Sequence, residues 1–151
     1  MAHVYVGYDE YGLEGVDDEF IQFIFDIVVS LTKLDPDSEA GLVVTSDERM
    51  QQLNKQYRGK DSSTNVLSFG YAETTPEEFM DPGDENYIGD IYMSRAKILE
   101  EAKAAGISDR ERFVRLFVHG ALHLAGMNHE IESEAISMED LEDKIVDQVL
   151  L

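Results

Sequence analysis

The spacing of apolar and polar residues predicts four strands and five helices. Short apolar runs flanked by polar or turn-forming residues predict strands at 2–8, 42–45, 66–69 and 87–93. Helices are expected after the capping residues Asp17, Thr45, Ser94 and Ser108, with a final amphipathic helix at about 134–150. The order β-α-β-α-β-β-α-α-α predicts an α+β fold, with a small mixed four-stranded sheet covered by about five helices.

The helix that follows Ser108 is apolar nearly all round, so we expect it to be buried. After Phe113 its only polar side chains are those of Arg115, His119 and His123. Gly126 can end this helix, because glycine enters the left-handed conformation without a side-chain clash. In contrast, residues 72–86 are acidic and contain two prolines, which predicts a solvated loop.

Length and composition predict one cytoplasmic domain over residues 1–151. No apolar run approaches the length of a membrane span, and the first residues lack the pattern of a signal peptide. We therefore expect no membrane association. Because the chain has no cysteine, any metal must be held by His, Asp or Glu.

The formal net charge is -20. A charge of this sign argues against nonspecific binding to nucleic acids, which requires a basic surface, and it favours solubility as the main role of the acidic residues. A local basic cleft is still compatible with it. Two stretches supply candidate cations, namely Lys55, Arg58 and Lys60 in one and Arg110, Arg112 and Arg115 in the other.

Three of the four histidines follow the spacing H-x-x-x-H-x-x-G-x-x-H, as His119, His123 and His129. The first two are four residues apart and share one helix face, and the chain can return His129 towards them after Gly126. Three neutral imidazoles leave a fourth tetrahedral position open on zinc, as in catalytic zinc sites. We predict one zinc ion per chain at this site, with another divalent transition metal as the alternative.

Other interpretations of the histidines are less favoured. A lone buried histidine is usually a hydrogen-bonded core residue, but two neighbouring imidazoles on an apolar helix are costly to bury without a shared partner. The spacing also matches the zinc motif of metzincin peptidases, H-E-x-x-H-x-x-G-x-x-H, whose glutamate is the general base. Here Gly120 takes the place of that glutamate, which argues against a peptidase.

With Gly120 in place, residues 119–129 resemble the signature H-G-x-L-H-L-x-G-Y-D-H of the YbeY family of bacterial metal-dependent endoribonucleases. Residues 53–69 are similar to that family's segment L-N-x-x-Y-R-x-K-D-x-x-T-D-V-L-S-F, and residues 89–94 to its strand G-D-I-x-I-S. The three motifs occur in the family's order. The chain departs from them at Met127 and Asn128, which replace Tyr-Asp, and at Gly70, where proline often occurs.

The resemblance implies an α+β fold with a metalloprotease-like active-site helix and three histidines at the end of a cleft. It also implies cleavage of single-stranded RNA in 16S rRNA 3′-end maturation and ribosome quality control. Arg58 matches the family's functionally important arginine. Since Asn128 has no charge, the resemblance leaves open whether it can support the metal as the family's carboxylate would.

These residues suggest a mechanism for RNA cleavage. A metal at the histidines would lower the pKa of bound water to about 7, and Arg58 would bind phosphate through its planar guanidinium. Lys60, Thr64 and Ser68 are candidate RNA-binding donors in the same cleft. Glu130 follows His129 directly, but a solvated turn residue is the favoured interpretation. Because no carboxylate base is evident near the histidines, attack by hydroxide without a protein base is the working hypothesis.

Two other functions remain open. The chain could be a ribosome-assembly protein whose metal mainly holds the fold, since its acidity suits basic ribosomal proteins of the small subunit. It could also be a metallopeptidase-like hydrolase, against which Gly120 argues. The expected partners are therefore single-stranded RNA or rRNA and the ribosome, with no DNA and no membrane.

Overall fold

A computed structural model describes residues 1–71, 86–127 and 132–151. Four strands, β1 (His3–Tyr8), β2 (Glu39–Thr45), β3 (Val66–Gly70) and β4 (Tyr87–Ser94), form one sheet in the order β1-β2-β4-β3. β1, β2 and β4 are parallel, and β3 runs antiparallel to β4, so that Ser68 lies opposite Ile91. The mixed four-stranded sheet of the predicted fold class is confirmed. Most of the predicted loop at 72–86 lies outside the described residues.

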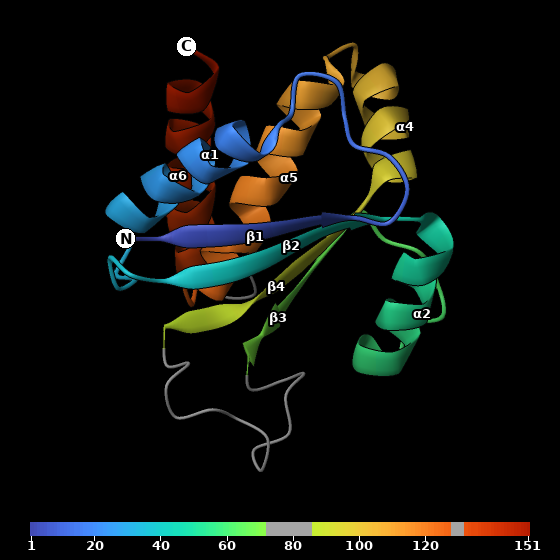
Figure 1. Cartoon of the computed structure of the whole chain (residues 1–151), viewed down its shortest axis with the longest axis horizontal. Coiled ribbons are helices and arrows are strands. Elements are labelled where there is room, and N and C mark those ends of the chain that lie inside the picture. The colour runs from blue at the N-terminus through green and yellow to red at the C-terminus, as the bar shows by residue number, and fades with distance from the viewer. Residues whose placement is uncertain (72–85, 128–131) are drawn as a thin grey trace.

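Five helices in the described chain cover the sheet unequally (Figure 1). The helices α1 (Asp18–Ser30), α4 (Arg95–Ala105), α5 (Asp109–Leu124) and α6 (Glu132–Leu150) lie on one side of it. Only α2 (Asp47–Arg58) lies on the other side, against β3 and β4. Within the described residues, no helix is both long and apolar enough to cross a bilayer.

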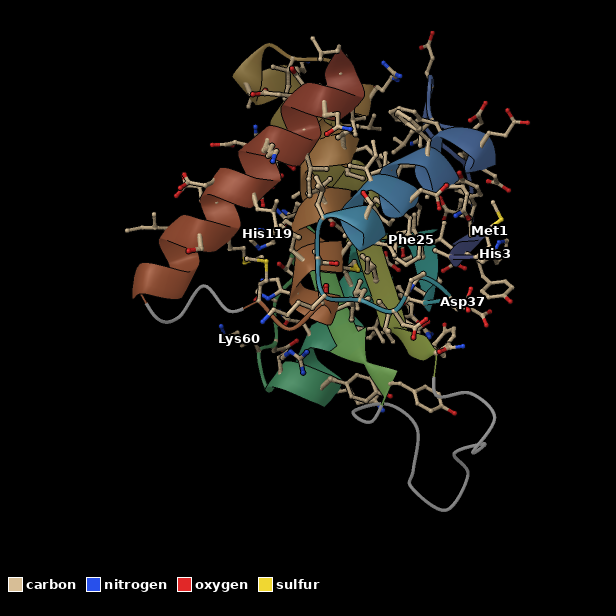
Figure 2. All side chains as sticks on the ribbon, turned by 90° about the vertical axis from the view of Figure 1, so that its left-hand side faces the viewer. Met1, His3, Phe25, Asp37, Lys60 and His119 are labelled. Atoms are coloured by element: carbon tan, nitrogen blue, oxygen red, sulfur yellow. The ribbon has the colours of Figure 1, made fainter. Side chains whose placement is uncertain are left out.

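The main core lies between the sheet and the four helices on its first side. Phe25 of α1 is fully buried there, beside Phe113 and Phe117 of α5 (Figure 2). Met138 of α6 is also buried in this core, as its helical spacing with apolar neighbours predicts. A smaller cluster under α2 contains Met50, Leu53, Leu67 and Phe69. The helix α5, which carries His119 and His123, therefore packs between the sheet and the neighbouring helices.

One predicted helix cap is wrong. The capping box at Thr45 and Glu48 does not form, because Thr45 is the last residue of β2 and its hydroxyl donates to Asp9. Ser46 caps α2 instead, accepting from the backbone N–H of Arg49 at 3.2 Å. The predicted caps at Asp17, Ser94 and Ser108 each accept a backbone N–H three residues onward and are confirmed.

The end of α5 has the geometry expected of a glycine stop. Gly126 has φ 91°, and its N–H donates to the carbonyl of His123 at 3.0 Å. The N–H of Met127 donates to the carbonyl of Leu122 at 3.1 Å, which completes a Schellman motif. The helix therefore ends immediately after the second histidine, as the sequence predicts.

Candidate metal and nucleic-acid site

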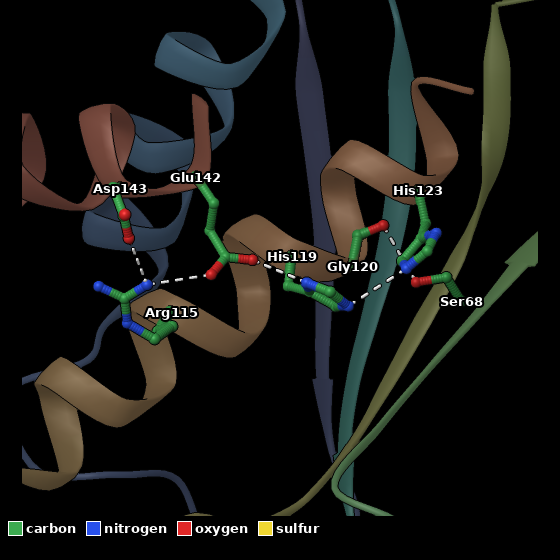
Figure 3. A network of polar contacts seen from close by, with 7 residues as sticks. All are labelled: Ser68, Arg115, His119, Gly120, His123, Glu142 and Asp143. Atoms are coloured by element: carbon green, nitrogen blue, oxygen red, sulfur yellow. Dashed lines mark hydrogen bonds and ion pairs between the residues drawn. The ribbon is translucent and has the colours of Figure 1, made fainter. Parts of the chain in front are cut away.

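His119 and His123 project from α5 on the same face, and their Nε2 atoms lie 3.2 Å apart (Figure 3). The imidazole planes meet at 80°, with ring centroids 4.7 Å apart. Both side chains are only partly buried, and every buried side-chain nitrogen or oxygen in the described residues has a partner. The burial cost expected from the sequence therefore does not support a metal site. The support comes from the convergence of the two Nε2 atoms.

Glu142 of α6 contacts Nδ1 of His119, the ring nitrogen that does not face His123. Its Oε1 lies 2.7 Å from Nδ1 of His119, and its Oε2 accepts from Nη1 of Arg115 at 3.0 Å. The same Nη1 donates to Asp143 at 2.9 Å. Although partial burial alone would lower the pKa of Arg115, its hydrogen bonds to Asp143 and Glu142 raise the pKa above the usual value. This network fixes α6 against the helix that bears the histidines.

His119 and His123 line a cleft of about 700 Å³. Four side chains of α5 that line it, Arg112, Arg115, His119 and His123, follow one helix face. The opposite wall comes from β3 and the end of α2, and includes Asn65, Ser68 and Arg58. The cleft thus brings Arg58 and Ser68 together with two of the three predicted metal ligands.

Arg58 is held at the cleft by the neighbouring strand. Its Nη2 donates to the carbonyl of Ser68 at 2.8 Å, and its guanidinium carbon lies 4.8 Å from the centre of the Phe69 ring. The sequence alone also allowed a surface salt bridge for this residue. In the structure, contacts with β3 place the guanidinium at the same cleft as the histidines.

The remaining predicted RNA-binding donors differ in position. Ser68 lines the cleft, but its hydroxyl already donates to the carbonyl of Gly120 at 3.0 Å. Lys60 and Thr64 are not among the described residues that line the cleft. Contact of these three residues with RNA remains a prediction.

The side chains present fit a zinc ion. Two nitrogens bound tetrahedrally at about 2.0–2.1 Å from one zinc are roughly 3.3 Å apart, close to the 3.2 Å between the two Nε2 atoms. In the described ranges, which exclude 128–131, no group of three or more His, Asp or Glu is arranged to hold a metal. The predicted third ligand, His129, lies outside the described residues, as does Asn128. The complete ligand set therefore remains a prediction.

Gly120, which takes the place of the peptidase glutamate, packs closely against the sheet. A Cβ built at Gly120 would lie 3.0 Å from Oγ of Ser68 and 3.1 Å from a methyl group of Ile91. These contacts show that α5 approaches the sheet at this residue, so that a side chain here would meet β3 and β4. A glutamate at this position would require Ser68 and Ile91 to shift by a few tenths of an ångström.

Sequence reasoning missed Glu142. It found no carboxylate base near the histidines, whereas the structure brings the carboxylate of Glu142 within hydrogen-bonding distance of His119 across 23 positions of sequence. Glu142 lies on an acidic helix, where its neighbours Asp140 and Asp143 give the same polar signal. Only its burial distinguishes it, and burial depends on how α6 packs.

The fold and the histidine-bearing helix define an α+β protein with a candidate metal cleft. The sequence model of the family described as Endoribonuclease YbeY matches residues 13–150, and the chain belongs to this family. Among its relatives, the Endoribonuclease YbeY of Rhodospirillum rubrum is 42% identical over 108 residues, which is 72% of this chain and 54% of that protein. The match therefore spans about half the length of that relative.

Two further comparisons cover a larger share of the related protein. The Endoribonuclease YbeY of Sulfurihydrogenibium sp. is 36% identical over 135 residues, or 89% of this chain and 84% of that protein. The solution structure of TM1509 from Thermotoga maritima superposes with a TM-score of 0.64, at 23% identity, over 97% of this chain and 88% of that one. The latter likeness supports the fold alone.

Proposed function

We propose that this protein is a metal-dependent endoribonuclease that cuts single-stranded RNA at the cleft between α5 and β3. The observation that carries the proposal is the convergence of the two histidine Nε2 atoms at a cleft that Arg58 also lines. Membership of the Endoribonuclease YbeY family supports the reaction class. By the same relationship, we propose 16S rRNA 3′-end maturation and ribosome quality control as its role, and the cytoplasm as its location.

The proposed metal is zinc, held by His119, His123 and His129. When bound, zinc supplies Lewis acidity and lowers the pKa of water, so that hydroxide is available near neutral pH. Arg58 holds the non-bridging oxygens of the scissile phosphate and offsets the charge that develops there. Glu142 does not serve as a general base, because both of its oxygens are already engaged by His119 and Arg115.

A cleavage assay tests this proposal. The zinc-loaded protein is incubated with single-stranded rRNA beside a chelated sample and the variants His123→Ala and Arg58→Ala. We expect cleavage by the intact protein and a loss of cleavage in all three controls. Cleavage that persists unchanged in His123→Ala, with metal dependence retained, would contradict the proposed metal centre.

A second candidate function is ribosome assembly, with a metal that mainly stabilises the fold. The net charge of -20 favours it, because ribosomal proteins of the small subunit are basic. The discriminating result would be association with the small subunit by a protein that cuts no RNA when fully loaded with zinc. A metallopeptidase is disfavoured by the close packing of Gly120 on the sheet, and a casein digest tests it directly.

A further inference from the structure

Among the described residues, Glu142 supplies a carboxylate within hydrogen-bonding distance of the histidine pair, through His119. It is largely buried, with 9% of its surface exposed, and it comes from a different helix (Figure 3). A carboxylate buried to this degree is costly unless its oxygens are paired. Here each oxygen has one partner, since Oε1 faces His119 and Oε2 faces Arg115.

This contact determines which nitrogen of His119 carries the proton. An ionised carboxylate can only accept hydrogen bonds, so Nδ1 of His119 must be the donor across the 2.7 Å contact. A neutral imidazole that is protonated at Nδ1 has its lone pair at Nε2. Nε2 is the atom that faces His123, so the lone pair points where a shared metal would lie.

Arg115 holds the carboxylate in place for this role. Its Nη1 bridges Oε2 of Glu142 and Oδ1 of Asp143, which lie next to each other on α6. A glutamine at position 142 would place an NH2 donor where one of the two carboxylate oxygens now accepts, so either His119 or Arg115 would face a donor instead of an acceptor. The charge and both oxygens of Glu142 are therefore needed for the contacts observed.

We propose that Glu142 is a positioning residue that selects the Nδ1–H tautomer of His119 and thereby strengthens metal binding by its Nε2. The inference rests on the proposed metal site and adds a residue of α6 to it. Carboxylates that orient metal-bound histidines affect metal affinity by roughly 10- to 100-fold. Because Glu142 lies on α6, the packing of this helix against α5 affects how strongly the histidines bind metal.

The tautomer is measured first, in metal-free protein, by two-bond nitrogen–proton NMR of the imidazole rings at alkaline pH, where histidine is neutral. A His119→Asn variant assigns the signals of His119. We expect wild-type His119 to be protonated at Nδ1 and Glu142→Gln to populate the other tautomer. Asp143→Asn is the matched control, since Asp143 contacts Arg115 but not the histidine. Protonation at Nε2 in the wild type would overturn the proposal without any variant.

Zinc affinity is measured next, by competition with a chromophoric chelator. We expect Glu142→Gln to bind zinc roughly 10- to 100-fold more weakly than the wild type, and Asp143→Asn to bind within about twofold of it. Circular dichroism and thermal unfolding of the metal-free variants verify that they fold. Equal zinc affinity in Glu142→Gln and the wild type would overturn the positioning role alone. Failure of the wild type to bind zinc would overturn both this role and the proposed metal site.

Discussion

At the scale of single residues, Arg58 illustrates how the fold orients a side chain that we propose binds phosphate. Its guanidinium donates to the carbonyl of Ser68 while lying over the ring of Phe69, so its orientation is set before any substrate binds. A lysine would keep the charge but lose the planar group that makes both contacts at once. Preorganisation of this kind is what a phosphate-binding group in a cleft requires.

We therefore expect Arg58→Lys to cut single-stranded RNA roughly 10- to 100-fold more slowly, the range for losing a charged hydrogen bond. The initial rate of cleavage under subsaturating RNA measures the effect. Arg49→Lys is the control, because Arg49 lies on the same helix but lines a separate small pocket beside Tyr92. Equal activity in Arg58→Lys and the wild type would show that charge alone is sufficient at this position.

The sequence predicts some site residues better than others. His119 and His123 are found from a four-residue spacing on one helix, and Gly126 from its position after them, because these features are local. Glu142 is not found, because its contact with His119 depends on how α6 crosses α5. The cap at Ser46 is missed for a similar reason, since β2 continues through Thr45 and moves the start of α2 by one residue.

At the scale of elements, the fit between α5 and the sheet depends on Gly120. A methyl group here would approach Ser68 and Ile91 to 3.0–3.1 Å, and it would disturb the hydrogen bond from Ser68 to the Gly120 carbonyl. The gain in helix propensity from alanine is about 1 kcal/mol and opposes this strain. Overpacking of a tight core site costs about 1–3 kcal/mol.

Gly120→Ala is accordingly expected to lower the free energy of unfolding by up to about 2 kcal/mol, the difference between these two effects. Urea denaturation followed by circular dichroism measures this change. Ala104→Gly provides a comparison at an exposed position of α4, where only the helix-propensity effect operates. If Gly120→Ala were more stable than the wild type, the close approach of α5 to β3 and β4 would not be a constraint.

Strand β4 carries two tyrosines whose ionisation should limit stability at high pH. Burial raises the pKa of Tyr87 and of Tyr92, and Asp90 raises both further, in part through its hydrogen bond from the Tyr87 hydroxyl. In the unfolded chain these phenols ionise at about pH 10. Above that pH the unfolded chain has lost protons that the folded protein still holds, so stability falls as pH rises.

Tyr87→Phe should therefore show a shallower loss of stability than the wild type as the pH is raised from 9 towards 11. Urea midpoints across this range provide the measurement, and Tyr11→Phe, at a largely exposed position, serves as the control. An unchanged slope in Tyr87→Phe would mean that this hydroxyl ionises alike in the folded and unfolded chain.

At the scale of the whole molecule, the net charge of -20 must be reconciled with the proposed RNA substrate. The cleft gathers three arginines, Arg58, Arg112 and Arg115, on walls from α2 and α5. Arg112 and Arg115 are paired with carboxylates, since Arg112 donates to Glu101 at 2.8 Å and Arg115 to Glu142 and Asp143. We therefore expect attraction of RNA to be confined to the cleft and weakened by the paired carboxylates, with repulsion of RNA by the rest of the acidic chain.

This distribution of charge predicts a weak dependence of RNA binding on salt. Each phosphate neutralised on a single strand contributes a slope of about -0.7 to log K against log salt, so three cleft arginines set a limit near -2. Repulsion from the remaining charge is screened as salt rises, which makes the slope shallower still.

Fluorescence anisotropy with a short labelled RNA across a salt series measures this slope, using His123→Ala protein to prevent cleavage. Arg58→Ala in that background should reduce the slope by about 0.7. A slope of about -4 or steeper would mean that cations outside the cleft bind the RNA, and the RNA-binding surface would then have to extend beyond the cleft.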